Sequence, residues 1–192
     1  IENVVGTGEV DYIVGSASAN TITGGAGNDV LTGGAGVDTF VRNGDGTTDG
    51  VDVVTDFTAG NGGDIIDLTT SAAAGTGITA GNLMSGVNLN GTGGAADIVD
   101  GGFVTIADNA ATLDAAGIAN VATAGANDLT VNVAADNVFY IAVDNGVDTV
   151  IALVTADTAG TAIVAADVTV IMTLTGVSDA TSLTAANFAD FI

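Results

Sequence analysis

Residues 6–41 read GTGEVDYIV GSASANTIT GGAGNDVLT GGAGVDTFV, a nine-residue unit that repeats four times without a gap. Each unit begins with a turn and ends with a short apolar segment, and its eighth place holds a large apolar residue: Ile13, Ile22, Leu31 or Phe40. Repetition at a fixed short period is typical of a solenoid, in which each unit supplies one turn and one strand. The sequence therefore predicts a stack of parallel β-strands.

The sixth place of every unit holds a short oxygen-bearing side chain, in turn Asp11, Asn20, Asp29 and Asp38. Glycines before it allow positive φ angles and leave main-chain carbonyls accessible, and the aspartate turns a carboxylate toward them. Calcium takes about six to eight oxygen ligands of these kinds. Because one unit supplies only half a coil, we expect unit n to stack on unit n+2, with an ion between the stacked turns.

The third and fourth units match the pattern GGxGxDxUx at every defined place and resemble the calcium-binding repeats of the RTX (repeats-in-toxin, hemolysin-type) proteins. The resemblance implies a parallel β-roll that folds when it binds Ca2+. A single glycine-rich unit would be read more simply as an exposed turn, but four units in register favour calcium. The residues expected at the metal are Asp11, Gly24, Gly25, Ala26, Gly27, Asp29, Gly33, Gly34, Ala35, Gly36 and Asp38, with Asp45 and Asp52 as candidates for closing a last site.

The first two units depart from the pattern. Ser16, Ala17 and Ser18 replace the glycine-rich turn of the second unit, and Asn20 replaces its carboxylate. We therefore expect a weak or vacant site on the edge of the roll that carries Asn20. Asp38 lies on that same edge and would need carbonyls of its own turn, or a later partner around Asp52.

Residues 50–68 resemble the end of the β-roll in RTX proteases and lipases, through Gly50, Asp52, Asp56, Phe57, Asp64, Ile66, Asp67 and Leu68. The roll is expected to end here. The alternation of the segment predicts capping strands with apolar residues inward and aspartates outward. For Asp56, Asp64 and Asp67 this favours ordinary solvated carboxylates.

The remaining sequence completes an all-β prediction, a parallel β-roll followed by an antiparallel β-rich domain. Residues 1–68 would form the roll and residues 69–134 an Ala-, Gly- and Thr-rich connecting region, whose one helix candidate has Thr112 as N-cap. Residues 135–192 would form the C-terminal domain, with a hairpin at Asn145 and Gly146 and a strand at residues 168–177.

The last 60 or so residues resemble, more loosely than the repeats, the C-terminal region of RTX-type surface proteins and of S-layer proteins exported by type I secretion. The resemblance implies an uncleaved secretion signal at the C-terminus. A plain terminal strand is the competing interpretation, and both can hold together.

Composition excludes several classes of function. The chain of 192 residues has 23 acidic side chains against the single basic residue Arg42, a net charge of −22. Such a charge repels nucleic acids and anionic membranes. Without His, Cys or Lys the chain has no Ser-His pair, thiolate nucleophile or Schiff-base lysine. We expect no enzymatic activity, no nucleic-acid partner and no membrane insertion.

These observations lead to a secreted calcium-binding structural protein of the cell surface or extracellular space. Calcium would fold it, and it would assemble as a homo-oligomer or polymer into an S-layer or filament, with cell-surface polysaccharide as a further partner. The alternative is a calcium-dependent secretion and folding module of an RTX-type hydrolase or adhesin whose functional domain lies upstream.

Overall fold

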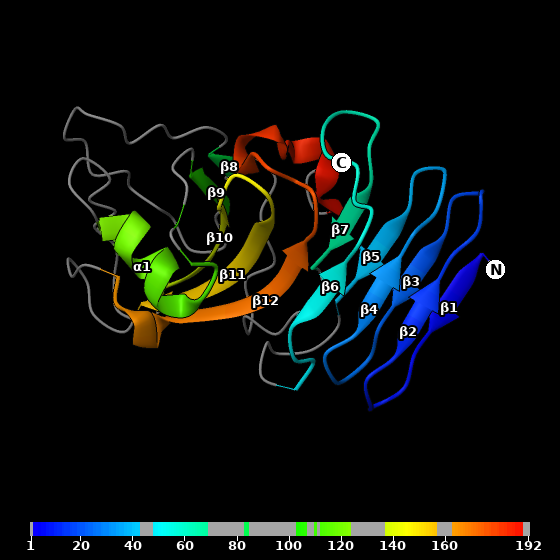
Figure 1. Cartoon of the computed structure of the whole chain (residues 1–192), viewed down its shortest axis with the longest axis horizontal. Coiled ribbons are helices and arrows are strands. Elements are labelled where there is room, and N and C mark those ends of the chain that lie inside the picture. The colour runs from blue at the N-terminus through cyan, green and yellow to red at the C-terminus, as the bar shows by residue number, and fades with distance from the viewer. Residues whose placement is uncertain are drawn as a thin grey trace.

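The structure is a computed structural model, and it describes residues 2–42, 48–68, 83–84, 103–106, 110, 112–123, 137–156 and 163–189. Among these residues it is mostly β, with a single α-helix and a few short 3-10 turns. Figure 1 shows the N-terminal strands stacked at one end of the molecule and the helix α1 near the other end.

The N-terminal strands are three residues long and stack in two parallel sheets. One sheet runs β1-β3-β5-β7 and the other begins β2-β4-β6. Tyr12 pairs with Val30, and Thr21 pairs with Thr39. Unit n therefore stacks on unit n+2, which confirms the predicted coil. The strands are β1 Asn3–Val5, β2 Tyr12–Val14, β3 Thr21–Thr23, β4 Val30–Thr32, β5 Thr39–Val41, β6 Asp52–Val54 and β7 Ile65–Asp67.

A narrow apolar core lies between these two sheets. Because side chains alternate along a strand, the middle residue of each of the strands β2 to β5 points inward and its neighbours point outward. The inward residues are the ones at the eighth place of the repeat, and later coils continue the row with Val54 and Ile66. All of them are buried: Ile13, Ile22, Leu31, Phe40, Val54 and Ile66. The ring of Phe57 closes on Phe40 at a centroid distance of 6.1 Å.

The second sheet does not end with the repeats. Strand β12 (Val168–Leu174) pairs in parallel with β6, so the sheet order is β2-β4-β6-β12-β11-β10-β9-β8. Strands β10 (Asn137–Asp144), β11 (Thr149–Ala156) and β12 are antiparallel, whereas β8 (Leu83–Met84) and β9 (Phe103–Ile106) join in parallel. The predicted antiparallel segment thus shares a sheet with the repeats.

The hairpin predicted at Asn145 and Gly146 is confirmed. These residues join β10 to β11, Gly146 has a φ of +82°, and the Asn145 N–H donates to the Asp148 carbonyl at 3.1 Å. One face of the hairpin packs on the core of the repeats, and the other face packs with Ile118 of α1 in a second cluster.

Helix α1 (Ala115–Thr123) begins one residue after Asp114, whose Oδ1 accepts a hydrogen bond from the Gly117 N–H at 2.8 Å. This bond also lowers the pKa of Asp114. The prediction that Thr112 caps the helix is therefore wrong. Thr112 instead donates its hydroxyl to Asp114 Oδ1 at 3.0 Å, because a carboxylate is the stronger acceptor.

The C-terminal residues cover the last coil of the repeats. Three short 3-10 turns, Ala165–Asp167, Ala180–Ser182 and Ala185–Asn187, flank or follow β12. Buried Asn187 accepts from the Gly60 N–H at 2.9 Å and donates to the Asp64 carbonyl at 2.8 Å, and Phe188 bridges to Ile66 of β7. The β1-β3-β5-β7 sheet therefore ends at β7, where the sequence places the end of the roll.

Candidate metal centre

The glycine-rich turns stack directly on one another. The turn at residues 24–29 lies over the turn at residues 6–11, where the Ala26 N–H donates to the Thr7 carbonyl at 3.0 Å. Gly25 has a φ of +106°, and a Cβ added to it would collide with the Thr7 carbonyl oxygen. The sequence needs glycine here both for the backbone conformation and for the close approach of the two turns. This is the stacking expected from the repeat.

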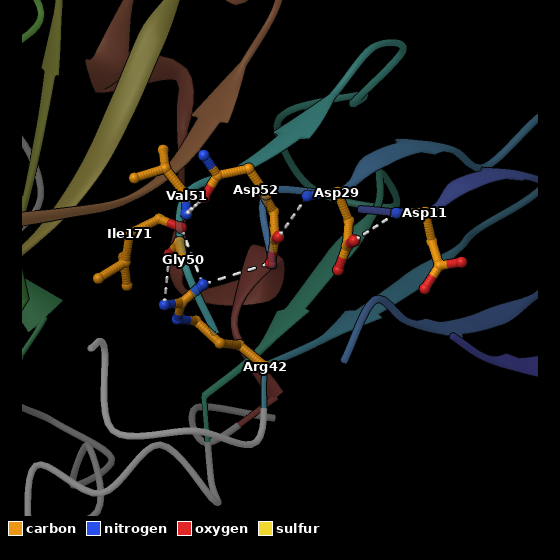
Figure 2. Close-up of polar contacts among 8 residues, drawn as sticks. Asp11, Asp29, Arg42, Gly50, Val51, Asp52 and Ile171 are labelled. Carbon is orange, nitrogen blue, oxygen red and sulfur yellow. Dashed lines mark hydrogen bonds and ion pairs between the residues drawn. The ribbon is translucent and has the colours of Figure 1, made fainter. Parts of the chain in front are cut away.

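Aspartates link the stacked turns in a row along one edge. We define the first edge as the turns at residues 6–11, 24–29 and 48–52. Asp29 Oδ1 accepts from the Asp11 N–H at 2.8 Å, and Asp52 Oδ1 accepts from the Asp29 N–H at 3.1 Å. Figure 2 shows these three residues in a row. Each bond uses one carboxylate oxygen and leaves the other for a different partner.

The second oxygen of Asp29 is the most informative atom of the row. Asp29 is fully buried, and its Oδ2 has no hydrogen-bond partner within the described part of the chain. A Cβ added to Gly24 would collide with this oxygen, so the turn leaves room for it only because residue 24 is glycine. A buried anionic oxygen without a partner is costly, and a bound cation removes that cost.

The surrounding donors fit calcium. Among the described residues, no group of three acidic side chains converges as a metal site, so the carboxylates alone do not supply a full set of ligands. Main-chain carbonyls of the glycine-rich turns would supply most of the oxygens, which suits calcium and not a metal that prefers nitrogen or sulfur. Bound calcium would supply the positive charge that the buried carboxylate lacks.

Asp11 lies at the open end of the row and is half-buried. Its Oδ2 accepts from the Thr7 N–H at 2.6 Å and from the Thr7 hydroxyl at 2.8 Å, which closes its own turn. This turn has Thr7 where the third unit has Gly25.

The second edge consists of the turns at residues 15–20, 33–38 and 58–64, and it repeats the same row. The Asn20 N–H donates to Asp38 Oδ1 at 2.8 Å, and the Asp38 N–H donates to Asp64 Oδ1 at 2.9 Å. The expectation that Asp38 meets a partner around Asp52 is wrong, because Asp52 stacks on Asp29 along the first edge. Asp64 takes that place.

The remaining predicted ligands of the second edge lie in its middle turn. Gly34 and Gly36 have φ angles of +101° and +112°, and the Ala35 N–H donates to the Ser16 carbonyl at 3.1 Å. A Cβ added to Gly33 would collide with Asp38 Oδ2, just as Gly24 makes room for Asp29. The structure thus brings these residues together with Asp38 and not with Asp29.

The side chain of Asn20 forms its hydrogen bonds within its own turn. Its side-chain nitrogen donates to the Ser18 carbonyl at 2.6 Å and to the Ser16 hydroxyl at 3.1 Å, while its oxygen accepts from the Ser16 N–H at 2.6 Å. The amide nitrogen thus uses a carbonyl that would otherwise be free to bind a cation. This gives a physical reason for the weak site predicted at Asn20, which stays a prediction.

Two carboxylates of the capping segment are not ordinary solvated groups, contrary to the expectation from sequence. Asp64 is buried and its Oδ2 accepts from the Thr58 N–H at 2.8 Å. Half-buried Asp56 accepts from the N–H groups of Gly33 and Gly34 at 2.9 and 2.8 Å. Asp52 is also buried, so the predicted outward direction of the capping aspartates is wrong there. The alternation of inward and outward side chains does not hold at Asp52, because its carboxylate continues the row of hydrogen bonds between stacked turns.

The buried charges perturb one another. The Arg42 guanidinium is buried and forms an ion pair with Asp52 Oδ2 at 3.3 Å. It also donates to the carbonyls of Gly50 and Ile171 at 2.8 and 2.9 Å, as Figure 2 shows. Burial nevertheless raises the pKa of Asp52 from 3.8 to about 6, and the charges of Asp29 and Asp49 contribute in the same direction. Burial also raises the pKa of Asp38, with help from the charges of Asp64 and Asp56.

Sequence reasoning missed one buried aspartate of these edges, Asp49, and interpreted another, Asp64, as an ordinary solvated carboxylate. Asp49 occupies the place of Ala26 in the first-edge turn at residues 48–52, and Asp64 follows Asp38 by 26 residues where a regular repeat would give 18. Residues 49–52 (DGVD) align with residues 26–29 (AGND), and this match could have identified Asp49. The predicted ligand Asp45 lies outside the described residues.

Comparison with known families supports the repeat. Residues 5–40 match the family model of the RTX calcium-binding nonapeptide repeat in four copies. A search of curated proteins finds no match to the chain. None of the helices in the described ranges is long and apolar enough to cross a membrane. Calcium binding is thus implied by the matched repeats and is compatible with the geometry of their turns.

Proposed function

We propose that this chain is a secreted, calcium-binding structural protein whose repeat segment folds when calcium neutralises its stacked turns. The observation that carries the proposal is the buried Oδ2 of Asp29, an anionic oxygen without a hydrogen-bond partner in the described structure. RTX repeat proteins are typically secreted, and calcium outside the cell is abundant enough for sites with dissociation constants of about 10⁻⁴ to 10⁻³ M.

The charge of the chain supports a switch from an extended to a folded state. With a net charge of −22, carboxylates repel one another in the compact chain. Where free calcium is scarce, this repulsion opposes folding of the repeats and suits export by type I secretion. Where calcium is plentiful, binding to the folded state alone stabilises that state.

Folding of the repeats would be transmitted to the rest of the molecule. Strand β6 of the repeats pairs with β12 (Met172 with Asp52), and Ile171, Met172 and Leu174 share the core of the repeats. Asn187 adds hydrogen bonds to the last coil. A calcium-bound roll would therefore present one continuous sheet as a fixed building block without catalytic function.

Self-assembly is supported by the end of the sheets at β1 and β2. Among the described residues these strands have a neighbouring strand on one side only, and an exposed strand edge is a template for further strand pairing. Apolar side chains of this end are unusually exposed: Val5, Val10, Tyr12 and Val14, with Tyr12 79% exposed. We propose that this end joins another copy in a filament or surface layer, to which a cell-surface polysaccharide also binds.

Sedimentation velocity with and without calcium tests this function. We expect monomers in EDTA and large assemblies at millimolar calcium, and we expect Tyr12→Thr with Val14→Thr to reduce assembly while leaving calcium-induced β structure intact. A matched control is Val164→Thr, which changes an exposed apolar residue at the start of the 3-10 turn before β12. A wild-type chain that folds with calcium and remains monomeric at high concentration would contradict the assembly proposal.

A further inference from the structure

The turn at residues 48–52 copies the turn at residues 25–29. Asp52 accepts from the Asp29 N–H as Asp29 accepts from the Asp11 N–H. The Val53 N–H donates to the Asp29 carbonyl at 2.8 Å, as the Val30 N–H donates to the Asp11 carbonyl at 2.9 Å. The first edge therefore has a third turn, which lies beyond the residues matched by the family model.

The approach of this turn to its neighbour is as close as that of the preceding pair. Gly50 has a φ of +67°, and a Cβ added to it would collide with the Gly27 carbonyl oxygen. The Val51 N–H donates to Asn28 Oδ1 at 2.9 Å. The Gly27 carbonyl oxygen thus lies next to the turn that carries Asp49.

Asp49 has no structural role among the described contacts. Its side chain is 6% exposed, and its Oδ2 has no hydrogen-bond partner in the described part of the chain. Its charge raises the pKa of Asp52, so the two carboxylates lie near each other. The buried Oδ2 of Asp29 is a second oxygen in the same condition.

The described buried charges at the turns of residues 24–29 and 48–52 sum to −2. Asp29, Asp49 and Asp52 are buried carboxylates, and the cation among their described neighbours is Arg42, which pairs with Asp52. Figure 2 shows Arg42 beyond Asp52, at the end of the row that begins with Asp11. Three negative charges and one positive charge give a net charge of −2, which one divalent cation would neutralise.

We infer that Asp49 is a ligand in a further calcium site, formed between the turns at residues 24–29 and 48–52. The inference rests on the proposed calcium-binding function and extends it past the matched repeats. The expected ligand is a hard divalent cation, because carboxylate and carbonyl oxygens are the groups that these two turns offer. Arg42 acts as the fixed cation that ends the array, held by the carbonyls of Gly50 and Ile171.

The number of calcium ions bound by the full chain tests this site. Equilibrium dialysis against calcium would compare the wild-type chain with Asp49→Asn and with Glu2→Gln, which removes the same charge from an exposed side chain. We expect Asp49→Asn to lose one bound calcium per chain and Glu2→Gln to lose none. Equal numbers and affinities in both variants would overturn the site while leaving the proposed function intact. A wild-type chain that binds no calcium would overturn both.

Asp49→Glu separates loss of a ligand from loss of folding. It keeps the carboxylate, so we expect it to retain the full number of ions. Thermal melts at limiting and at saturating calcium supply a second measure, because removing a buried charge relieves repulsion where the site is empty. Asp49→Asn should melt no lower than the wild-type chain at limiting calcium and should gain less from the saturating concentration. An equal loss of melting temperature in both conditions, with unchanged ion number, would assign Asp49 a purely structural role and overturn the inference.

Discussion

At the scale of single residues, Asp29 and Asp52 of the first edge each divide their two oxygens between two tasks. In Asp29 one oxygen accepts the Asp11 N–H and ties the coils together, whereas the other is buried without a described partner. In Asp52 the second oxygen meets Arg42. The same residue type therefore ties the stacked turns to one another and creates the need for a cation.

The raised pKa of Asp52 predicts a pH dependence for the calcium-free chain. Its pKa in the folded state is about 6 against an ordinary value of 3.8, so the folded state favours the protonated form. The contribution of this group to stability is fully present below pH 4 and is lost as the pH rises through 6, by about 3 kcal/mol.

Far-UV circular dichroism in calcium-free buffer, from pH 4 to pH 7, measures this effect as the amount of β structure. The wild-type chain should lose β structure across that range, and Asp52→Asn should lose clearly less. Asp38, whose pKa is also raised, contributes in the same direction and remains in both proteins. Identical pH profiles for the two proteins would show that Asp52 is not the group concerned.

At the scale of elements, the stacked turn and its short strand are the unit of structure. The glycines of the turn differ in how much the stack depends on them. Gly25 has a positive φ and faces the Thr7 carbonyl, whereas a Cβ added to Gly8 would meet nothing within 4 Å. The two glycines lie in adjacent turns of the same edge and form a matched pair.

Gly25→Ala should therefore destabilise the calcium-bound chain by about 1–3 kcal/mol, because of the strained backbone and the collision between turns. Gly8→Ala should change the free energy of unfolding by no more than about 0.5 kcal/mol. Urea unfolding at saturating calcium measures both. A similar loss in the two variants would mean that the close stacking of turns is not what the glycine pattern provides.

The repeat itself was readable from sequence because its period is strict. Strand positions, the inward row from Ile13 to Phe40 and the stacking of alternate units all follow from that period. After Val41 the separation between stacked aspartates changes from 18 residues to 23 and 26. Periodicity then no longer identifies partners, so Asp49 was missed and the partner of Asp38 was expected around Asp52 and not at Asp64.

At the scale of the whole molecule, the repeats and the C-terminal strands share a sheet. The pairing of β6 with β12 joins residues about 120 positions apart, such as Asp52 and Met172. No local pattern in the sequence predicts this pairing, since the sequence of β12 is equally compatible with a strand in a separate sheet. The domain boundaries proposed from sequence stay predictions, while the hydrogen bonds between these segments make coupled folding the expectation.

The central claim is that calcium folds the stacked turns through buried carboxylates such as Asp29. The most direct test is a calcium titration of the EDTA-treated full chain, followed by far-UV circular dichroism, with Asp29→Asn and Glu2→Gln as paired variants and magnesium as the control ion. The account predicts that β structure appears at sub-millimolar to millimolar calcium, that magnesium does not replace calcium, and that Asp29→Asn requires at least about tenfold more calcium, equivalent to about 1.4 kcal/mol. A chain that is fully folded in EDTA, or an Asp29→Asn variant that titrates like Glu2→Gln, would contradict it.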